Sequence, residues 1–277
     1  MKLKTLLLVG LFIQIVFAQD FEKVKPQDLR SSVDFLSSDV LKGRETATQG
    51  ELVAAQFIRS KFIEAGIKPY FDTYFDTFES TRFKGINVVG FIEGIDPELK
   101  NEVVLLGAHY DHIGIAGKVQ NDSIANGAND NASGVACLLA IAEAFKNNKQ
   151  PKRSVVFLAV TAEEQGLLGS AYYSEHPIFA AQKTVANINM DGLLTPGKMK
   201  DLTITGFGHS EMDEYAKTEA EKLGRYIIPD PEAEKGYFFR SDHFNFAKIG
   251  IPSFFAYASF DAVNGGKEII KKEYQDS

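Results

Sequence analysis

The sequence predicts an α/β protein, a three-layer α/β/α sandwich built on a mostly parallel or mixed central sheet. Apolar runs of strand length alternate along the chain with segments of helical spacing, which is the order expected for a sheet covered by helices. The central runs, such as VVFLAV at residues 155–160, are apolar at successive positions, so we expect both of their faces to be buried. With 277 residues and 44% hydrophobic content, the chain can bury one large core, and we expect one domain.

The N-terminus has the pattern of a secretory signal peptide. Two lysines precede an apolar stretch, residues 6–17, and the sequence VFA at residues 16–18 is typical of a cleavage site. The apolar stretch is short for a membrane span. We therefore expect residues 1–18 to be removed and residues 19–277 to be secreted or periplasmic, without membrane attachment after cleavage. An uncleaved N-terminal anchor is the alternative.

Helices and strands are expected in a regular order along the rest of the chain. Residues 26–40 and 47–65 have helical spacing, and in the second segment apolar side chains recur every three or four positions until Gly66. Six strands are expected, at residues 86–94, 102–111, 154–163, 184–193, 201–208 and 252–258. Helices are expected between several of them, at residues 133–148, 166–176 and 209–224. Such sheets bind ligands beyond the carboxyl ends of their strands, so the residues at those ends are candidates for a functional site.

Charge and cysteine content exclude several classes of protein. Residues 1–18 carry two lysines and no acidic residue, so their removal would change the formal net charge from −7 to −9. An acidic exported chain is a poor candidate for binding nucleic acid or anionic lipid. The single cysteine, Cys137, cannot form an intramolecular disulfide, and its apolar surroundings, VACLLAIAEAF, predict a core thiol.

Side chains of metal-ligand type follow four of the predicted elements, at strand ends or in the loops after them. They are His109 and Asp111, Asp130, the pair Glu163 and Glu164, and Asp191. His109 and Asp111 are two apart, so in an extended segment both point to the same face. Imidazole and carboxylate ligands gathered from separate strand ends suit a borderline metal ion, with zinc the first choice.

Each of these residues also has an ordinary structural explanation. An aspartate before a helix is usually an N-cap, and either Asp130 or Asn131 could have that role. Two glutamates at a strand end, such as Glu163 and Glu164, are usually solvated, and His112 could be an exposed loop residue. Their occurrence together at one end of the predicted sheet favours a site over these separate explanations.

Other catalytic chemistries fit the sequence less well. The chain has no H-E-x-x-H helix, no G-x-S-x-G turn, no Walker loop and no G-x-G-x-x-G fingerprint. Ser241, Asp242 and His243 are the three residue types of a serine-hydrolase triad. Consecutive residues cannot form that relay, so we interpret the sequence as a coincidence.

Four segments together resemble a known enzyme family. The sequences GAHYDHIG, NGANDNASGVACLLAIAEAF, TAEEQGLLGSAYY and NINMDGL are similar to those of M28 zinc metallopeptidases, which are mostly aminopeptidases. The similarity continues upstream in LKGRETATQGELVAAQFI and downstream in PDPEAEKGYFFRSDHFNFAKIGIP, in order and over nearly the whole mature chain. The resemblance implies the zinc-dependent exopeptidase fold, peptide substrates and a site for two zinc ions.

The resemblance also implies a role for each candidate ligand. His109 and Asp191 would bind one zinc ion and Glu164 the other. Asp130 would bridge the two ions through its two carboxylate oxygens, with a cis peptide bond to Asn131.

The remaining roles implied by the resemblance concern catalysis and substrate binding. Glu163 would be the general base, taking a proton from the attacking water and passing it to the leaving amine. Asp111 would sit behind the histidine ligand of the first zinc ion and orient it. Phe239, Arg240 and His243 would lie near the substrate pocket, although a plain core role is an equal alternative for the aromatic side chains of this segment.

One ligand of the family site has no counterpart in the sequence. In the family, a histidine late in the chain completes the coordination of the zinc ion held by Glu164. The five histidines are His109, His112, His176, His209 and His243, and none matches that position. We therefore expect a C-terminally incomplete peptidase domain with a second zinc site one ligand short. The alternatives are a shortened paralogue and substitution by His243.

The expected function is that of an exported zinc aminopeptidase, which hydrolyses N-terminal residues from peptides through a co-catalytic two-metal site. A glutaminyl-cyclase-like transferase on the same scaffold, which would need one zinc ion, is one alternative. A catalytically silent truncated paralogue is the other.

Overall fold

The computed structural model describes residues 24–268 except 120–121, 147–149, 194 and 196. The predicted signal peptide, residues 1–18, lies outside the described residues. None of the described helices is long and apolar enough to cross a membrane.

The centre of the molecule is a nine-stranded mixed sheet. Its strands are β1 (Lys68–Pro69), β2 (Phe75–Glu79), β3 (Lys84–Ile92), β4 (Val103–His109), β7 (Ser154–Val160), β8 (Thr184–Asn189), β9 (Asp201–Ile204), β10 (Tyr226–Pro229) and β11 (Ser253–Ala258). The order across the sheet is β1-β3-β7-β4-β8-β11-β9-β10, and β2 also pairs with β3. The neighbours β7, β4, β8 and β11 are mutually parallel, while β3 and β9 run antiparallel to them. A separate two-stranded hairpin is formed by β5 (Ile115–Val119) and β6 (Asp122–Ile124).

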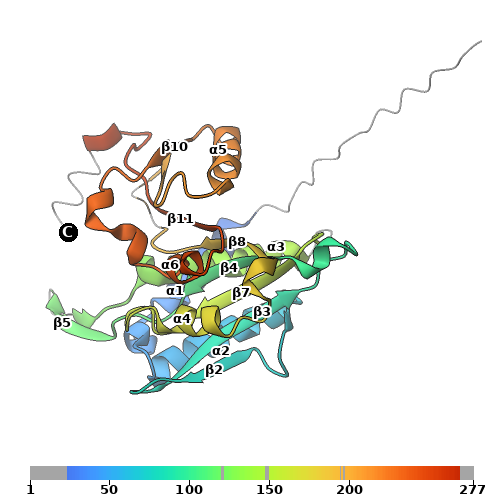
Figure 1. Cartoon of the computed structure of the whole chain (residues 1–277). Helices are drawn as coiled ribbons and strands as arrows, with labels where there is room; N and C mark the ends of the chain where they lie inside the picture. Colours follow the sequence, from blue (N-terminus) through green and yellow to red (C-terminus); the bar gives the residue numbers. More distant parts are fainter. Residues whose placement is uncertain (1–23, 120–121, 147–149, 194, 196, 269–277) are drawn as a thin grey trace, which may run out of the picture.

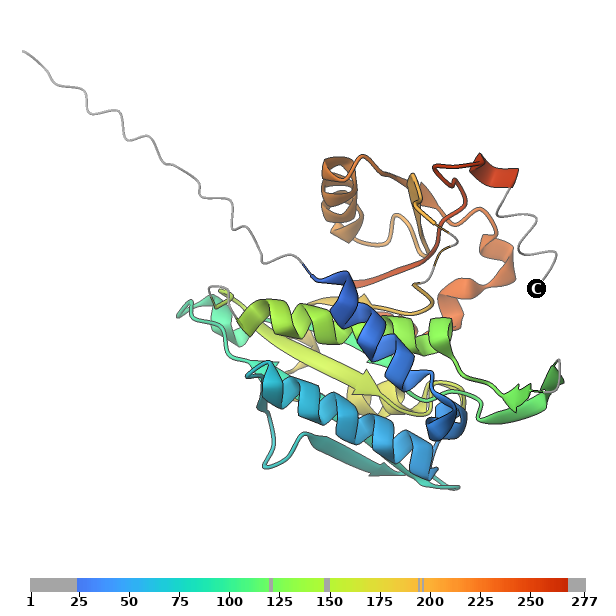
Figure 2. The same ribbon diagram turned by 180° about the vertical axis from the view of Figure 1, so that it is seen from behind.

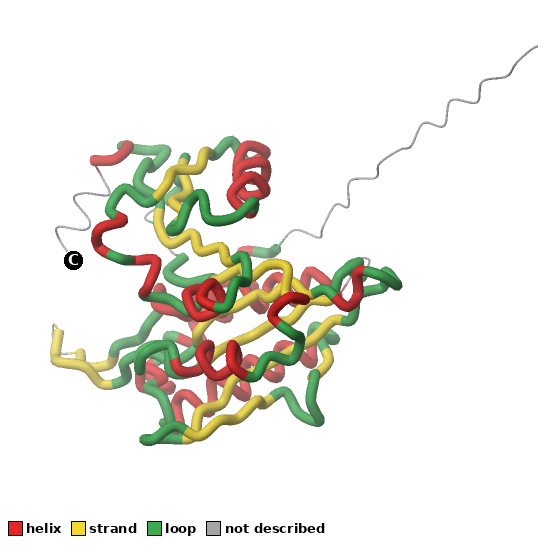
Figure 3. Tube along the Cα trace, viewed as in Figure 1, coloured by secondary structure: helices red, strands yellow, loops and turns green. Residues whose placement is uncertain are grey.

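Helices cover both faces of this sheet. They are α1 (Pro26–Leu36), α2 (Gln49–Glu64), α3 (Gly134–Lys146), α4 (Leu168–Glu175), α5 (Met212–Lys222) and α6 (His243–Lys248). Figure 1 shows α4 and α6 in front of the central strands, and the view from behind in Figure 2 shows α1, α2 and α3 on the opposite face. Coloured by secondary structure, the same layers appear as strands between two sets of helices (Figure 3). The predicted three-layer α/β/α architecture is confirmed.

Alternation along β7 explains why its sequence is apolar from Val155 to Val160. Val155, Phe157 and Ala159 pack under α1, α2 and α3, whereas the intervening Val156 and Leu158 pack on the side of α4 and α6. Successive side chains of a strand point to opposite faces, so a strand between two helical layers needs apolar residues at every position.

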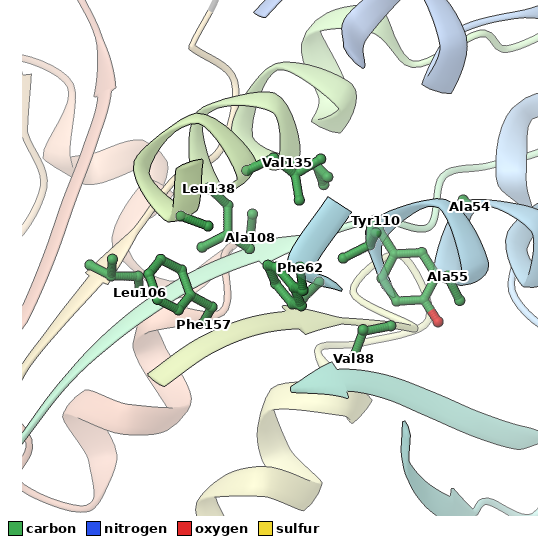
Figure 4. Packing of buried hydrophobic residues seen from close by; sticks show 14 of the residues in the cluster. Ala54, Ala55, Phe62, Val88, Leu106, Ala108, Tyr110, Val135, Leu138 and Phe157 are labelled. Carbon is green, nitrogen blue, oxygen red and sulfur yellow. The ribbon is translucent and has the colours of Figure 1, made fainter. Parts of the chain in front are cut away.

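The larger core lies between α2, α3 and the sheet. Phe62 of α2 is fully buried, and the centre of its ring lies 5.9 Å from that of Phe157 in β7. Figure 4 shows these two rings beside Leu138 of α3. Burial of each such side chain contributes roughly 1.5–3 kcal/mol, so this cluster fixes α2 and α3 against the sheet.

The main difference from the predicted elements concerns the ends of the strands. The strand expected at 154–163 ends at Val160, because Ala162 has a positive φ of 56° and the backbone turns there. The carbonyl of Glu163 accepts hydrogen bonds from the N–H groups of Gly166 and Leu167. Glu163 and Glu164 therefore lie in a turn beyond the strand, and not in it.

Candidate metal centre

The predicted ligand-type residues lie at one edge of the parallel part of the sheet. His109 is the last residue of β4, Asp191 follows β8, and the two glutamates follow β7. Because β4, β7 and β8 are parallel neighbours, their carboxyl ends meet at this edge. Asp130 lies in a turn, Ala128–Ser133, that leads into α3.

A first group of possible ligands surrounds His109. Ligand atoms of His109, Glu163 and Asp191 all lie within 4.8 Å of one another. Nε2 of His109 is 3.3 Å from Oδ1 of Asp191 and 3.1 Å from Oδ1 of Asp130. The histidine side chain is 1% exposed, so a single imidazole nitrogen faces several carboxylates in a buried position.

A second group lies beside the first and contains His112. Ligand atoms of His112, Asp130 and Glu164 also lie within 4.8 Å of one another. Nδ1 of His112 is 2.7 Å from Oε1 of Glu164 and 3.8 Å from Oδ2 of Asp130. The two oxygens of Asp130 thus face different histidines, and this carboxylate joins the two groups. The interpretation of His112 as an exposed loop residue was wrong, since its side chain is only 11% exposed.

Asp111 supports both groups from behind. Its side chain is fully buried, its backbone carbonyl is paired with Nδ1 of His109 at 3.2 Å, and its Oδ1 lies 3.6 Å from the same nitrogen. The same carboxylate accepts hydrogen bonds from the backbone N–H groups of Glu163 at 3.1 Å and Glu164 at 3.4 Å, and from the hydroxyl of Thr46 at 3.0 Å. One buried aspartate therefore fixes both the imidazole and the turn that carries the two glutamates.

Asn131 fixes the turn that carries Asp130. The peptide bond between the two residues is cis. The amide of Asn131 donates to the carbonyls of His109 and Met190, and its Oδ1 accepts the N–H of Gly134, the first residue of α3. Asn131, and not Asp130, thus caps the helix. The carboxylate of Asp130 is free to face the two histidines.

Arg44 is a positioning residue that the sequence did not single out, although it lies in the segment LKGRE. Its fully buried guanidinium donates hydrogen bonds to the carbonyls of Leu36, Tyr110, Asn126 and Gly127. These bonds tie the end of β4 to the loop before Asp130. Burial lowers the pKa of Arg44 to about 10, and the nearby carboxylates oppose this shift.

The electrostatics of the centre indicate an excess of negative charge. Burial raises the pKa of Glu163 well above that of an ordinary glutamate, and the charges of Asp242 and Asp191 add to the effect. Burial alone would lower the pKa of His109, but the carboxylates around it raise that pKa well above its usual value. A cation would relieve both effects. Nitrogen and carboxylate oxygen atoms are donors that zinc accepts, so the residues fit this metal ion.

The segment after α5 contributes a support for Asp191. The hydroxyl of Ser241 donates to Oδ2 of Asp191 at 2.7 Å, and Asn189 donates to the same hydroxyl at 2.7 Å. The neighbouring Asp242 accepts a hydrogen bond from Ser170 at 2.6 Å, and its pKa is raised by burial.

The three predicted substrate-pocket residues differ in their exposure. His243 is fully buried, with ring centres of Phe238 and Phe255 at 5.0 and 4.7 Å, and burial lowers its pKa to about 4. Within the part of the chain that the structure describes, it belongs to neither group of possible ligands, so substitution by His243 is not supported. Phe239 is 59% exposed, and the exposed Arg240 donates to the carbonyl of Lys235.

Comparison with known proteins finds relatives of this chain. A sequence model of peptidase family M28 matches residues 87–273. The leupeptin-inactivating enzyme 1 of Streptomyces exfoliatus is 30% identical over 73% of this chain and 42% of its own length. Aminopeptidase YwaD of Bacillus subtilis is 31% identical over 55% of this chain and 31% of its own length. The chain spans only 11–20% of the fungal vacuolar membrane proteases and of a probable zinc metalloprotease that it also matches.

Solved structures with low sequence identity share the fold. An aminopeptidase from Aneurinibacillus superposes with a TM-score of 0.64 at 16% identity, covering 91% of each chain. A Zn-dependent exopeptidase from Parabacteroides distasonis gives a TM-score of 0.66 at 18% identity, covering 88% of this chain and 87% of that one. A glutaminyl cyclase from Porphyromonas gingivalis gives 0.60 at 20% identity, covering 86% and 85%. At these identities, the similarity concerns the architecture alone.

Proposed function

This chain belongs to peptidase family M28, and on that premise we propose that it is a zinc-dependent aminopeptidase acting on the free N-termini of peptides. The observation that carries the proposal is the pair of ligand groups joined by Asp130, with Glu163 beside them. One group alone would suit a single ion. Two adjacent groups that share a carboxylate suit the co-catalytic centres of hydrolases.

The ligands for the two ions come from different elements. His109, Asp191 and one oxygen of Asp130 would hold one zinc ion, and Glu164 with the other oxygen of Asp130 would hold the second. When bound, the ions would lower the pKa of a water molecule and polarise the carbonyl of the scissile peptide bond. The buried Asp111 and Arg44 keep these side chains in place before any ion binds.

Glu163 is the proposed general base. Its raised pKa means that it holds a proton more firmly than an exposed glutamate does, which suits a group that accepts a proton and later returns it. It would take the proton of the water that attacks the carbonyl carbon. As the C–N bond breaks, the same carboxyl would pass this proton to the leaving amine. General acid–base catalysis of this kind contributes roughly 10²- to 10⁴-fold to a rate.

The test compares wild-type protein with Glu163→Gln on two matched peptides, one with a free N-terminus and one acetylated. We expect the wild type to release N-terminal residues from the free peptide only. The variant should bind as much zinc as the wild type and lose at least about 100-fold in kcat. Full activity of Glu163→Gln, or equal cleavage of the acetylated peptide, would refute the proposal. Cyclisation of a peptide with N-terminal glutamine, without hydrolysis, would favour a cyclase instead.

A further inference from the structure

We propose that His112 is a ligand of the second metal ion, completing a site with Asp130 and Glu164. The inference rests on the proposed two-metal function and names a residue that the family pattern does not. The nitrogen ligand would come from the loop directly after β4, three residues beyond His109.

The distances around His112 suit metal coordination. Its Nδ1 lies 2.7 Å from Oε1 of Glu164 and 3.8 Å from Oδ2 of Asp130. Zinc binds nitrogen and oxygen ligands at about 2.0–2.2 Å, so donor atoms around one ion lie roughly 3–4 Å apart. The distance to Asp130 falls within this range, whereas the shorter distance to Glu164 is that of a hydrogen bond.

The second group repeats the composition of the first. His109 directs Nε2 towards a carboxylate of its own, Asp191, and towards Oδ1 of Asp130. His112 directs Nδ1 towards a carboxylate of its own, Glu164, and towards Oδ2 of Asp130. Each group has one imidazole nitrogen, one separate carboxylate and one oxygen of the shared aspartate. Apart from Glu163, the proposed general base, the second set lacks nothing that the first contains.

The backbone holds His112 in this position. Its N–H donates to the carbonyl of Arg44 at 3.1 Å, and the residue forms a parallel bridge with Glu45. Arg44 is itself anchored by its buried guanidinium, and the preceding residue, Asp111, is fully buried. A ligand on so well anchored a segment is preorganised for binding, which lowers the entropic cost of forming the site.

A hydrogen bond from His112 to Glu164 is the competing explanation, in which His112 only positions the carboxylate. That hydrogen bond accounts for the 2.7 Å between Nδ1 of His112 and Oε1 of Glu164, but Oδ2 of Asp130, 3.8 Å from the same nitrogen, is beyond hydrogen-bond distance. An ion between the three side chains uses both contacts. The two explanations also predict different results for asparagine at position 112, because its amide places an N–H near the position of Nδ1 and can donate a hydrogen bond to Glu164, but it is a poor zinc ligand.

The experiment measures bound zinc per chain after dialysis, and zinc affinity by competition with a chromophoric chelator. We expect two zinc ions in wild-type protein and one in both His112→Ala and His112→Asn, with affinity for the second ion reduced at least about 100-fold. The matched control is His176→Ala, at an exposed histidine outside both groups, which should keep two ions. Two tightly bound ions in His112→Asn would overturn the assignment and leave a positioning role.

A measurement on wild-type protein avoids the question of whether a variant folds. In ¹⁵N-histidine-labelled protein with zinc, NMR distinguishes ring nitrogens that bind metal, and two should be found, Nε2 of His109 and Nδ1 of His112. Coordination through Nε2 of His109 alone would refute the inference. Two bound ions without hydrolysis would refute the proposed function but not the assignment of His112 as a ligand. Hydrolysis without a metal-bound Nδ1 would refute only the assignment of His112. Wild-type protein that binds no zinc would refute both.

Discussion

Glu51 is a buried glutamate near the metal centre, and its raised pKa provides a test of the packing there. Its side chain in α2 is 7% exposed, accepts a hydrogen bond from the hydroxyl of Thr161, and accepts a second from the N–H of Ala47 at 2.5 Å. Thr161 immediately precedes the turn that carries Glu163. Burial raises the pKa of Glu51 from 4.5 to about 7, and the two hydrogen bonds oppose this shift only in part.

The shift has a definite sign for stability. Because the folded protein binds this proton more tightly than the unfolded chain, the free energy of unfolding decreases as the pH rises from about 4.5 to about 7. At 1.36 kcal/mol per pKa unit, the free energy of unfolding should be about 3 kcal/mol lower above pH 7 than below pH 4.5. Glu51→Gln removes the titration, and its amide can still pair with both Ala47 and Thr161.

The assay is urea unfolding of metal-free protein between pH 4.5 and 8.5, because bound zinc would add its own pH dependence. The variant should match the wild type near pH 4.5 and exceed it by about 3 kcal/mol at pH 8.5. Glu64→Gln, on the exposed side of the same helix, should differ from the wild type by less than about 0.5 kcal/mol at every pH. A difference between Glu51→Gln and wild type that does not change with pH would refute the reasoning.

Three further results are expected. Phe62→Ala should lower the free energy of unfolding by about 3–5 kcal/mol in urea, because a fully buried ring leaves a cavity beside Phe157; a loss below about 1 kcal/mol would contradict the packing described. Ser241→Ala removes the hydrogen bond to Asp191 and should weaken binding of the first zinc ion roughly 10- to 100-fold in a chelator competition. An unchanged zinc affinity would show that this hydrogen bond has no influence on Asp191 as a ligand. Dialysis against a chelator should abolish peptide hydrolysis and lower the midpoint temperature of unfolding, and added zinc should reverse both effects. Hydrolysis that survives complete removal of metal would exclude a metal-dependent mechanism.

The part of the fold that the sequence predicted was the part with strong periodicity. The strands expected at 102–111 and 184–193 correspond to β4 and β8, because apolar runs of that length have few alternatives in a covered sheet. Short edge elements were missed. β10 is four residues long with partly exposed side chains, and it pairs on one side only, with β9, so its pattern resembles that of a loop.

Strand ends were less predictable than strand centres, for a physical reason. The β-branched Thr161 and the small Ala162 follow β7 without an evident turn signal, but the positive φ of Ala162 shows that the strand has ended. Adjacent residues of a strand point in different directions, which would separate Glu163 from Glu164 if both lay in β7. They do belong to different ligand groups, but the cause is a turn held by the buried carboxylate of Asp111.

The ligand residues of the candidate site were predicted from their residue types and positions. The contacts between segments distant in sequence were not predicted. His112 and Arg44 are 68 positions apart in sequence, and nothing local in either segment indicates that the backbone N–H of one pairs with the carbonyl of the other. The position of His243 was equally hidden. The two residues before it, Ser241 and Asp242, are polar, but the rings of Phe238 and Phe255 lie against it. Such environments arise from tertiary packing, which a single sequence does not display.

The most direct test of the central claim is a stepwise zinc titration of metal-free protein, with hydrolysis of a peptide that has a free N-terminus measured at each step. The account predicts no hydrolysis without zinc and a maximum at two ions per chain, with the acetylated peptide left intact throughout. A maximum at one ion, or release of N-terminal residues by the metal-free protein, would contradict a co-catalytic pair joined by Asp130.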